Sequence, residues 1–266
     1  MIHRFLIYIL LFFITKPVIA FEESLRPGGI AIIEVNSIES NLPEITFRKR
    51  PVTIINKENL WFAVVGIPLN AKDKITINFD DAEKTILISD HKYKEQRLKI
   101  ENKSQVNPNK NQLDRIYKER KIINAALNNF REIKLEDLSL AVPVDGPRSS
   151  SFGLRRFFNG QPRSPHSGMD ISAQTGTFIK NPRHGIVTVT GDYFFNGKTV
   201  IIDHGQGFIT MYCHLSEINV KEGDELFVND LIGLVGATGR VTGPHLHFGT
   251  YLNGTAIDPE IFINDF

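Results

Sequence analysis

Two histidines one residue apart, in the heptapeptide GPHLHFG at Gly243–Gly249, are residues whose spacing could support chemistry. In a β-strand, residues i and i+2 point to the same side of the sheet, so the imidazoles of His245 and His247 would lie close together. Either both bind one metal ion, or one binds it while the other acts on the chemistry beside it. Two polar residues that share an exposed strand face are the alternative.

A second candidate pair, His166 and Asp170, lies in the segment SPHSGMD. In a straight strand these residues would be ~13 Å apart, too far to share an ion. Pro165 and Gly168 disfavour a helix, so we expect a glycine-centred bend that brings both side chains to one point. A carboxylate and two imidazoles form a common three-ligand catalytic zinc site. His166, Asp170 and one histidine of HLH would supply this set.

Hydrolysis at such a site also needs groups that move protons. Zinc lowers the pKa of water, and the amine that leaves a cleaved amide must be protonated. Unliganded imidazoles suit both tasks because they titrate near pH 7. The candidates are the other histidine of HLH and His214, which follows a strand-like run. The sequence contains neither HExxH nor GxSxG, which excludes the helical zinc-peptidase motif and the nucleophile elbow.

The elements that must position these residues are mostly strands. From about Gly28 to Ile100, seven short runs rich in Ile, Val, Thr and Phe alternate with turn residues, which predicts a small immunoglobulin-like antiparallel sandwich. The polar segment Glu101–Gln112 reads as a linker. It leads into an amphipathic helix expected at Leu113–Phe130, with Asn111 as its N-cap. From about Leu138 onward, strands separated by glycine turns predict a second antiparallel β domain.

The start of the chain has the layout of a secretory signal peptide. A basic MIHR precedes an apolar run at Phe5–Ile14, and Val18–Ala20 ends in a small residue that permits cleavage. The apolar run is too short to span a bilayer, and no other stretch is long enough. We therefore expect a signal peptide at residues 1–20, an accessory β domain at 21–105, a linker and helix at 106–137, and the catalytic domain at 138–266.

The length, net charge and cysteine content of the chain exclude several other classes of protein. The 266 residues suffice for two domains, and a net charge of +1 gives no indication of nucleic-acid binding. The single cysteine, Cys213, excludes an internal disulfide and is expected to be a small buried strand residue. His204 is expected to be structural.

Several segments together resemble the lysostaphin-type, or LytM-domain, zinc endopeptidases, which cut peptides in bacterial cell-wall peptidoglycan. The resemblance is carried by HSGMDI, TVIIDHG, TMYCHL and IGLVGATGRVTGPHLHFG, in the family's order and spacing between about Val142 and Pro259. It implies a compact antiparallel β domain with a groove over the metal. The segment SSFGLRRFFNG is similar to the secreted two-domain members typical of Gram-negative bacteria, which act on peptides cross-linked directly through D-amino acids.

Carried over position by position, the resemblance implies that one zinc ion is held by His166, Asp170 and His247. His214 and His245 are then the two catalytic histidines. All five positions are filled, unlike in family members that have lost ligands and serve as activators. Arg155 is a candidate for holding a substrate carboxylate or stabilising the oxyanion, and an ordinary surface arginine is the alternative.

These observations predict an exported, periplasmic zinc endopeptidase that hydrolyses peptide cross-links of peptidoglycan as a D,D-endopeptidase does, with stem peptides as its partners. One alternative is a non-catalytic wall-binding protein that activates another hydrolase. Another is a zinc hydrolase with a different peptide substrate. We also hypothesise that the module Gly28–Ile100 and the helix Leu113–Phe130 cover the catalytic groove until they are displaced.

Overall fold

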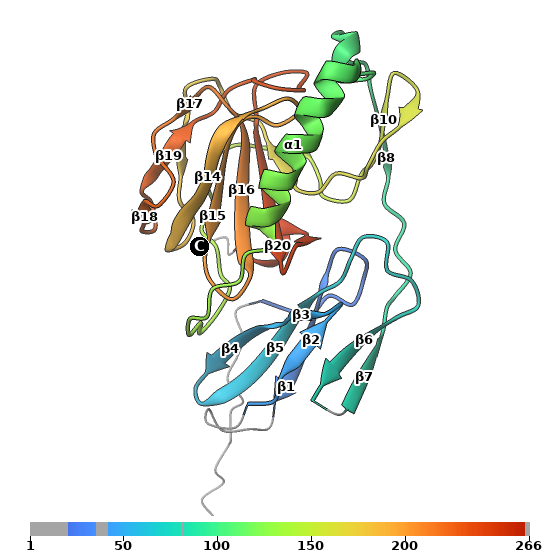
Figure 1. The fold of residues 1–266 in the computed structure, drawn as a ribbon, viewed down its shortest axis with the longest axis vertical. Helices are drawn as coiled ribbons and strands as arrows, with labels where there is room; N and C mark the ends of the chain where they lie inside the picture. The colour runs from blue at the N-terminus through green and yellow to red at the C-terminus, as the bar shows by residue number, and fades with distance from the viewer. Residues whose placement is uncertain (1–20, 36–41, 81, 264–266) are drawn as a thin grey trace, which may run out of the picture.

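The computed structural model describes residues 21–35, 42–80 and 82–263, so the expected signal peptide lies outside the described residues. The described chain is mainly β, as predicted, with an N-terminal β region below and a larger C-terminal β region above in Figure 1. One long α-helix crosses the front of the upper region. Among the described residues, no helix combines the length and apolar character that a membrane span requires.

The N-terminal region contains two small antiparallel sheets around one apolar core. The first has the order β1 (Ile30–Val35), β5 (Leu60–Gly66), β4 (Thr53–Lys57), and the second has the order β3 (Arg50–Pro51), β2 (Ile45–Phe47), β6 (Lys74–Phe79), β7 (Ala82–Leu87). Alternate residues of β1, Ala31 and Ile33, pack with Ile75 and Ile77 of β6. The predicted two-sheet sandwich is therefore confirmed.

The C-terminal region is built on one eight-stranded sheet and one small sheet. The large sheet has the order β18 (Glu225–Leu226), β14 (Gly185–Tyr193), β15 (Gly197–Asp203), β16 (Phe208–Leu215), β20 (Leu246–Leu252), β12 (Met169–Ile171), β9 (Arg148–Ser150), and β21 (Thr255–Ile257) also pairs with β20. The small sheet has the order β13 (Phe178–Lys180), β19 (Leu231–Leu234), β17 (Glu217–Ile218). Tyr212 and Phe248 of the large sheet share a core with Ile179 and Ile232 of the small sheet.

The helix α1 (Lys110–Leu127) covers the other face of the large sheet. Ala126 and Leu127 pack there with Ile201 and Met211, in a cluster that also contains Cys213, which is buried as expected. The buried side of the helix lies along β14, β15 and β16. The helix thereby forms one wall beside the site described below.

The start and the apolar stripe of α1 differ from the expectation. Asn109, rather than Asn111, is the N-cap, and it forms a capping box with Gln112. Leu113 and Tyr117 belong to the expected apolar stripe, yet they are 53% and 61% exposed. The buried side of the helix is therefore narrower than the spacing of its apolar residues indicates.

The segment that joins the two regions is part of the C-terminal one. Strand β8 (Glu95–Leu98) pairs in parallel with β10 (Arg155–Phe158), which turns back into β11 (Gln161–Pro162). After the short 3₁₀-helix η2 (Lys103–Gln105), Val106 packs with Phe158 and Ile100. The expected boundary near residue 105 thus falls inside a packed unit, and the expected linker is partly structured.

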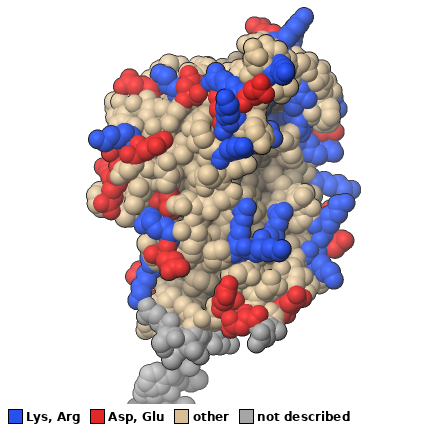
Figure 2. Space-filling view, viewed as in Figure 1, with Lys and Arg blue, Asp and Glu red and all other residues tan. Residues whose placement is uncertain are grey.

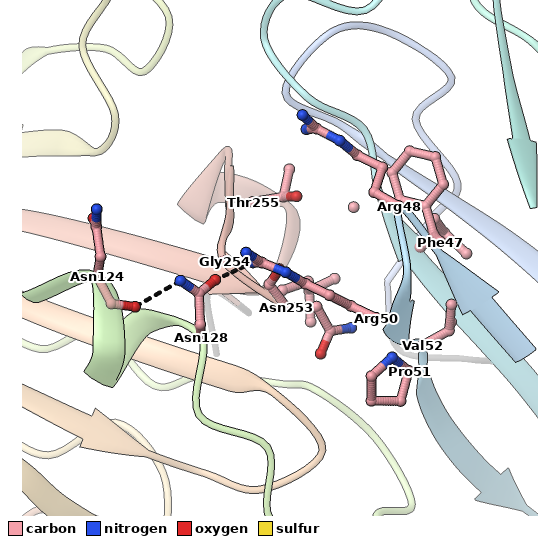
Figure 3. A pocket seen from close by; sticks show the side chains of 13 residues that line it. Phe47, Arg48, Arg50, Pro51, Val52, Asn124, Asn128, Asn253, Gly254 and Thr255 are labelled. Atoms are coloured by element: carbon pink, nitrogen blue, oxygen red, sulfur yellow. Dashed lines mark hydrogen bonds between the residues drawn. The ribbon is translucent and has the colours of Figure 1, made fainter. Parts of the chain in front are cut away.

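The two regions meet in a polar, positively charged junction. A cavity of about 360 Å³ lies there, with Arg48 of the β2–β3 turn and Arg50 of β3 on one side and Asn124 and Asn128 of the helix end on the other (Figure 3). Figure 2 shows a group of Lys and Arg side chains at this level of the molecule, below the helix. Beneath the junction the contact is apolar, because Ile55 of the N-terminal region belongs to the main core of the C-terminal one.

Candidate metal centre

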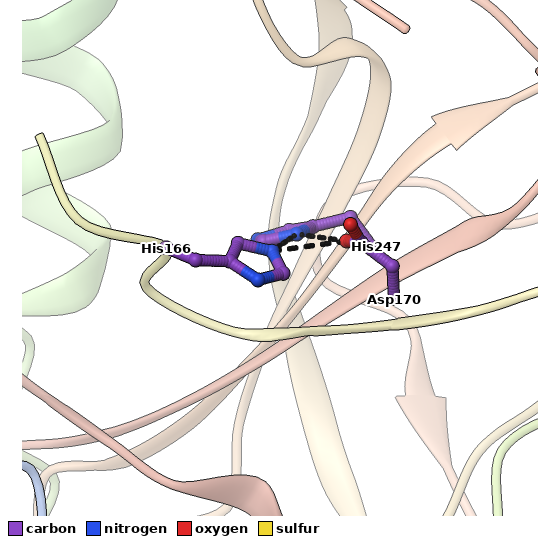
Figure 4. Close-up of side chains that lie close together, drawn as sticks. All are labelled: His166, Asp170 and His247. Carbon is purple, nitrogen blue, oxygen red and sulfur yellow. Dashed lines mark hydrogen bonds and ion pairs between the residues drawn. The ribbon is translucent and has the colours of Figure 1, made fainter. Parts of the chain in front are cut away.

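Three side chains, His166, Asp170 and His247, converge at one point near the edge of the large sheet (Figure 4). Asp170 of β12 and His247 of β20 are directly opposed cross-strand partners, so their side chains share one face of the sheet. His166 Nε2 lies 2.9 Å from His247 Nδ1 and 3.0 Å from Asp170 Oδ1. His247 Nδ1 lies 2.9 Å from the same carboxylate oxygen. The three residues that the sequence assigned to the metal are therefore brought together.

The bend expected between His166 and Asp170 is formed by residues 164–168, which belong to no strand or helix. Gly168 lies against β20 so closely that a Cβ there would be 2.4 Å from the carbonyl oxygen of Phe248 and 2.9 Å from the ring of His247. Only glycine fits this approach without displacing the backbone. The glycine thus allows His166 to fold back over the strand that carries His247.

The ligand atoms present lone pairs to one another. His166 Nδ1 is 2.8 Å from the carbonyl oxygen of Ser151, and because it donates there, the unprotonated Nε2 faces Asp170 and His247. Burial lowers the pKa of His166 to about 4, an effect that the contact with Asp170 partly offsets. Burial alone would raise the pKa of Asp170, but the contacts with His166 and His247 hold it below its ordinary value. Near neutral pH, His166 Nε2 and the Asp170 carboxylate therefore face the centre as acceptors.

This donor set fits a zinc ion. Acceptor atoms about 3 Å apart repel one another unless a cation lies among them, and two imidazole nitrogens with one carboxylate oxygen are usual zinc ligands. The Oδ2 oxygen of Asp170 accepts a hydrogen bond from Arg156 Nη2 at 2.8 Å, which turns the other oxygen toward the imidazoles. Such outer contacts orient the ligands of metal sites.

Two further imidazoles, those of His214 and His245, flank the three ligand residues. His214 Nδ1 is 2.9 Å from the carbonyl oxygen of Thr238, and His245 Nδ1 is 2.8 Å from that of Gly243. Each ring donates there, so each Nε2 is left as an acceptor. His245 Nε2 lies 3.7 Å from Asp170 Oδ1. The ring centroids of His214 and His245 are 4.9 Å apart.

The environment of His214 differs from that of a surface histidine. Burial, followed by the neighbouring His247 and His245, lowers the pKa of His214 well below 6.5. Its backbone lies in the left-handed region with φ of 70°, an uncommon conformation for a residue other than glycine. Such strain is concentrated at functional sites in proteins, and here it lies one residue before the end of β16, with the imidazole beside those of His245 and His247.

The structure does not bring Arg155 to this centre. Its side chain is 60% exposed and donates to Glu95 Oε1 at 3.1 Å. The adjacent Arg156 reaches Asp170 instead, because neighbouring residues of a strand point to opposite sides. Arg156 was not predicted from the sequence, and the only signal that could have found it is the alternation of β10. His204 is buried between the carbonyl oxygen of His184 and the hydroxyl of Thr210, as a structural residue.

Two cavities open onto the centre. The first, called here the helix-side cavity, has a volume of about 480 Å³ and lies between α1 and the residues 163–167 that carry His166. The second, the β8-side cavity, has a volume of about 300 Å³ and lies between β8 and the loop 240–245. Arg156, Phe158, His214 and Arg240 line both. No described residue of strands β1–β7 lines either cavity.

A groove over two imidazoles and a carboxylate, with two more imidazoles beside them, defines the site of a zinc hydrolase. Comparisons with known proteins agree with this class of enzyme. Residues 164–259 match Peptidase family M23, and residues 25–86 match the Peptidase family M23 N-terminal domain. The crystal structure of a putative peptidase M23 from Pseudomonas aeruginosa is 38% identical. It covers 92% of this chain, this chain covers 97% of it, and the TM-score is 0.76. The chain belongs to peptidase family M23, a family of zinc metallopeptidases.

Curated relatives match through the C-terminal region. The peptidoglycan DD-endopeptidase ShyA of Vibrio cholerae is 40% identical over 119 residues, which is 44% of this chain and 28% of the relative. The DD-carboxypeptidase/endopeptidase Mpg of Neisseria meningitidis is 38% identical over 111 residues, or 42% of this chain and 26% of the relative. The matched part thus spans little more than a quarter of these relatives. The family resemblance expected from the sequence motifs is confirmed.

Proposed function

We propose that this protein is a zinc endopeptidase that hydrolyses peptide cross-links of bacterial peptidoglycan, with DD-endopeptidase specificity. The observation that carries the proposal is the convergence of three ligand atoms within 3.0 Å of one another, flanked by two imidazoles with free Nε2 atoms. The names of ShyA and Mpg support the substrate class.

In this proposal His166, Asp170 and His247 hold the ion, and His214 and His245 handle protons. Zinc supplies Lewis-acid chemistry when bound, since it polarises a carbonyl and lowers the pKa of water. The carbonyl oxygens of Thr238 and Gly243 fix the tautomers of the two flanking imidazoles. Their Nε2 atoms can therefore accept a proton from the attacking water and return one to the leaving amine.

The test is a digest of purified, directly cross-linked peptidoglycan by the zinc-loaded protein, with fragments identified by mass spectrometry. We expect dimeric muropeptides to be converted to monomers, and we expect chelation or His245→Ala to reduce that conversion by at least ~100-fold. Zinc binding without cleavage would instead favour the alternative, a wall-binding protein that activates another hydrolase.

We also propose that the protein is exported to the periplasm through cleavage after residue 20. This proposal rests on the tripartite pattern of residues 1–20, and on the wall substrate named for the relatives. Cell fractionation followed by N-terminal sequencing of the recovered protein tests it. A mature chain that begins at Phe21 is the expected result, and a chain that retains Met1 in the cytoplasmic fraction would contradict it.

For the masking hypothesis, the element with the best support is α1 rather than the β sandwich. Ile116 and Glu119 of α1 line the helix-side cavity. The helix is held there by Arg115, which donates to the carbonyl oxygen of Asp192, and by Glu119, which accepts from the N–H of Phe194. We propose that α1 restricts access to this side of the centre.

The variant Arg115→Ala tests this role of α1, since it loosens the helix without altering the metal ligands. We expect higher endopeptidase activity on cross-linked peptidoglycan than in the wild type. Lys118→Ala, which changes an exposed residue of the same helix, is the matched control. Unchanged or lower activity in Arg115→Ala, with the fold intact by circular dichroism, would argue against masking.

A further inference from the structure

Positive charge dominates the helix-side cavity beside the metal centre. Its lining includes four arginines, Arg120, Arg156, Arg163 and Arg240. Among the described residues that line it, Glu119 alone is acidic, and this carboxylate is already engaged by Arg115 and by the N–H of Phe194. A cavity of this kind attracts anions and repels cations.

Arg163 and Arg240 have no carboxylate partner in the described part of the chain. Arg163 donates to the carbonyl oxygen of Val106 at 2.8 Å and to Gln161 Oε1 at 2.7 Å. Arg240 donates to the carbonyl oxygen of Gln105 at 3.3 Å. A half-buried guanidinium whose partners are all neutral leaves its charge uncompensated, which is unfavourable unless an anion joins it.

The guanidinium of Arg240 lies over two aromatic rings. Its central carbon is 4.1 Å from the ring centroid of Phe195 and 4.6 Å from that of Phe158. Ring contacts take none of the N–H groups of a guanidinium, so those not donated to Gln105 can bind a carboxylate, which arginine holds through two parallel hydrogen bonds. Burial, followed by the charges of Arg156 and Arg163, lowers the pKa of Arg240 to about 10, as expected where cations are close together.

Arg240 also occupies a central position over the centre. Together with His214 it lines both the helix-side and the β8-side cavity. A peptide bound beside His214 in either cavity is therefore within the same cavity as Arg240.

We infer that Arg240, supported by Arg163, is a specificity-determining residue that binds a free carboxylate of the peptide substrate close to the scissile bond. The inference rests on the proposed function and narrows its substrate class to stem peptides that carry free carboxylates rather than carboxamides. Arg240 acts on binding and on the position of the peptide, whereas the imidazoles act on the bond that is cleaved.

The test compares two cross-linked muropeptide dimers that differ only in whether their free carboxylates have been converted to carboxamides. We expect the zinc-loaded wild type to favour the carboxylate form by about 10- to 100-fold in kcat/KM, the range for a hydrogen bond to a charged group. In Arg240→Gln this preference is expected to disappear, mainly through a higher KM for the carboxylate form. Activity on the carboxamide form should fall much less than activity on the carboxylate form.

Matched variants separate recognition from a structural role. Arg155→Gln changes an exposed arginine of β10 and should keep the full preference for the carboxylate form. Arg240→Lys should keep part of that preference. An equal loss of activity on both dimers in Arg240→Gln would indicate a structural role and overturn the inference, as would equal wild-type activity on both. If the wild type cleaves neither dimer, the proposed function fails. Calorimetric binding of the two dimers then decides the inference, and equal affinities would overturn it.

Discussion

At the scale of single residues, Gly168 is as important to the centre as the ligands. It has no side chain to offer, but its close approach to β20 lets His166 reach the residues opposite. A side chain at this position must displace either the backbone of Phe248 or the ring of His247. The geometry of a zinc site is therefore determined in part by a residue that never contacts the ion.

We predict that Gly168→Ala weakens zinc binding by about tenfold or more, the effect usual when the surroundings of metal ligands are disturbed. Competition with a chromophoric chelator measures the affinity, and the melting temperature shows whether the fold is retained. Gly160→Ala is the control for backbone strain alone: its φ of 80° favours glycine, but a Cβ there would meet no atom within 4 Å, so the melting temperature falls while the zinc affinity stays at the wild-type value. An affinity in Gly168→Ala equal to that of the wild type would contradict this account.

A second prediction concerns His204, which lies away from the centre. Burial lowers its pKa to about 3, against ~6.5 in an unfolded chain. Between these values the unfolded state binds more protons, so the stability contributed by the neutral ring is present above pH ~6.5 and decreases as the pH falls toward 3. Each pKa unit of difference corresponds to about 1.4 kcal/mol.

We therefore expect the melting temperature of His204→Gln to depend less on pH than that of the wild type between pH 6.5 and 4. His184→Gln, which changes a histidine bound to the exposed Glu225, should leave the wild-type slope in place. Thermal unfolding of the chelated proteins followed by circular dichroism measures both slopes. Equal slopes in His204→Gln and the wild type would show that His204 does not carry this acid sensitivity.

At the scale of elements, the N-terminus of α1 depends on the capping box of Asn109 and Gln112. We predict that Asn109→Ala lowers the free energy of unfolding by about 1 kcal/mol. Asn111→Ala, two positions along and inside the first turn, should have a much smaller effect. Denaturant unfolding of the full chain measures both, and a larger loss in Asn111→Ala would contradict the assignment of the cap.

The same helix shows what the sequence could and could not predict. The family resemblance predicted that His166, Asp170 and His247 form one cluster, whereas local patterns predicted the strands and the presence of α1. They misplaced the cap, because Asn109 and Asn111 are equivalent in composition and only the backbone distinguishes them. They could not predict Arg156 against Asp170 or β8 against β10, because the periodicity of a strand does not show which strand or side chain it will pair with.

At the scale of the whole molecule, the N-terminal sandwich and the catalytic region share apolar packing. Ile55 and Phe62 belong to the same buried cluster as Phe208 and Ile257, and Arg26 forms an ion pair with Asp258 at 2.9 Å across the boundary. Such contacts couple the unfolding of the two regions. The sandwich is therefore a fixed support of the catalytic region rather than a separately moving module.

We predict that scanning calorimetry of the full chain shows one unfolding transition. Ile55→Ala, which opens a cavity in the shared core, should cost about 2–5 kcal/mol and lower that single transition as a whole. Ile77→Ala, in the sandwich's own core, is the matched comparison. Two well-separated transitions in the wild type would contradict coupling between the regions.

The parallel pairing of β8 with β10 gives the protein an unusual tolerance of a broken backbone. A protease cut at Asn107–Asn109 would leave a fragment that ends after β8 and a fragment that begins with α1. The strand pairing, the contacts of Ile100 and Val106 with Phe158, and the shared core would still hold the fragments together. On a native gel the nicked protein should migrate as one species. The catalytic groove would then belong to a split enzyme, complete only while both fragments remain associated.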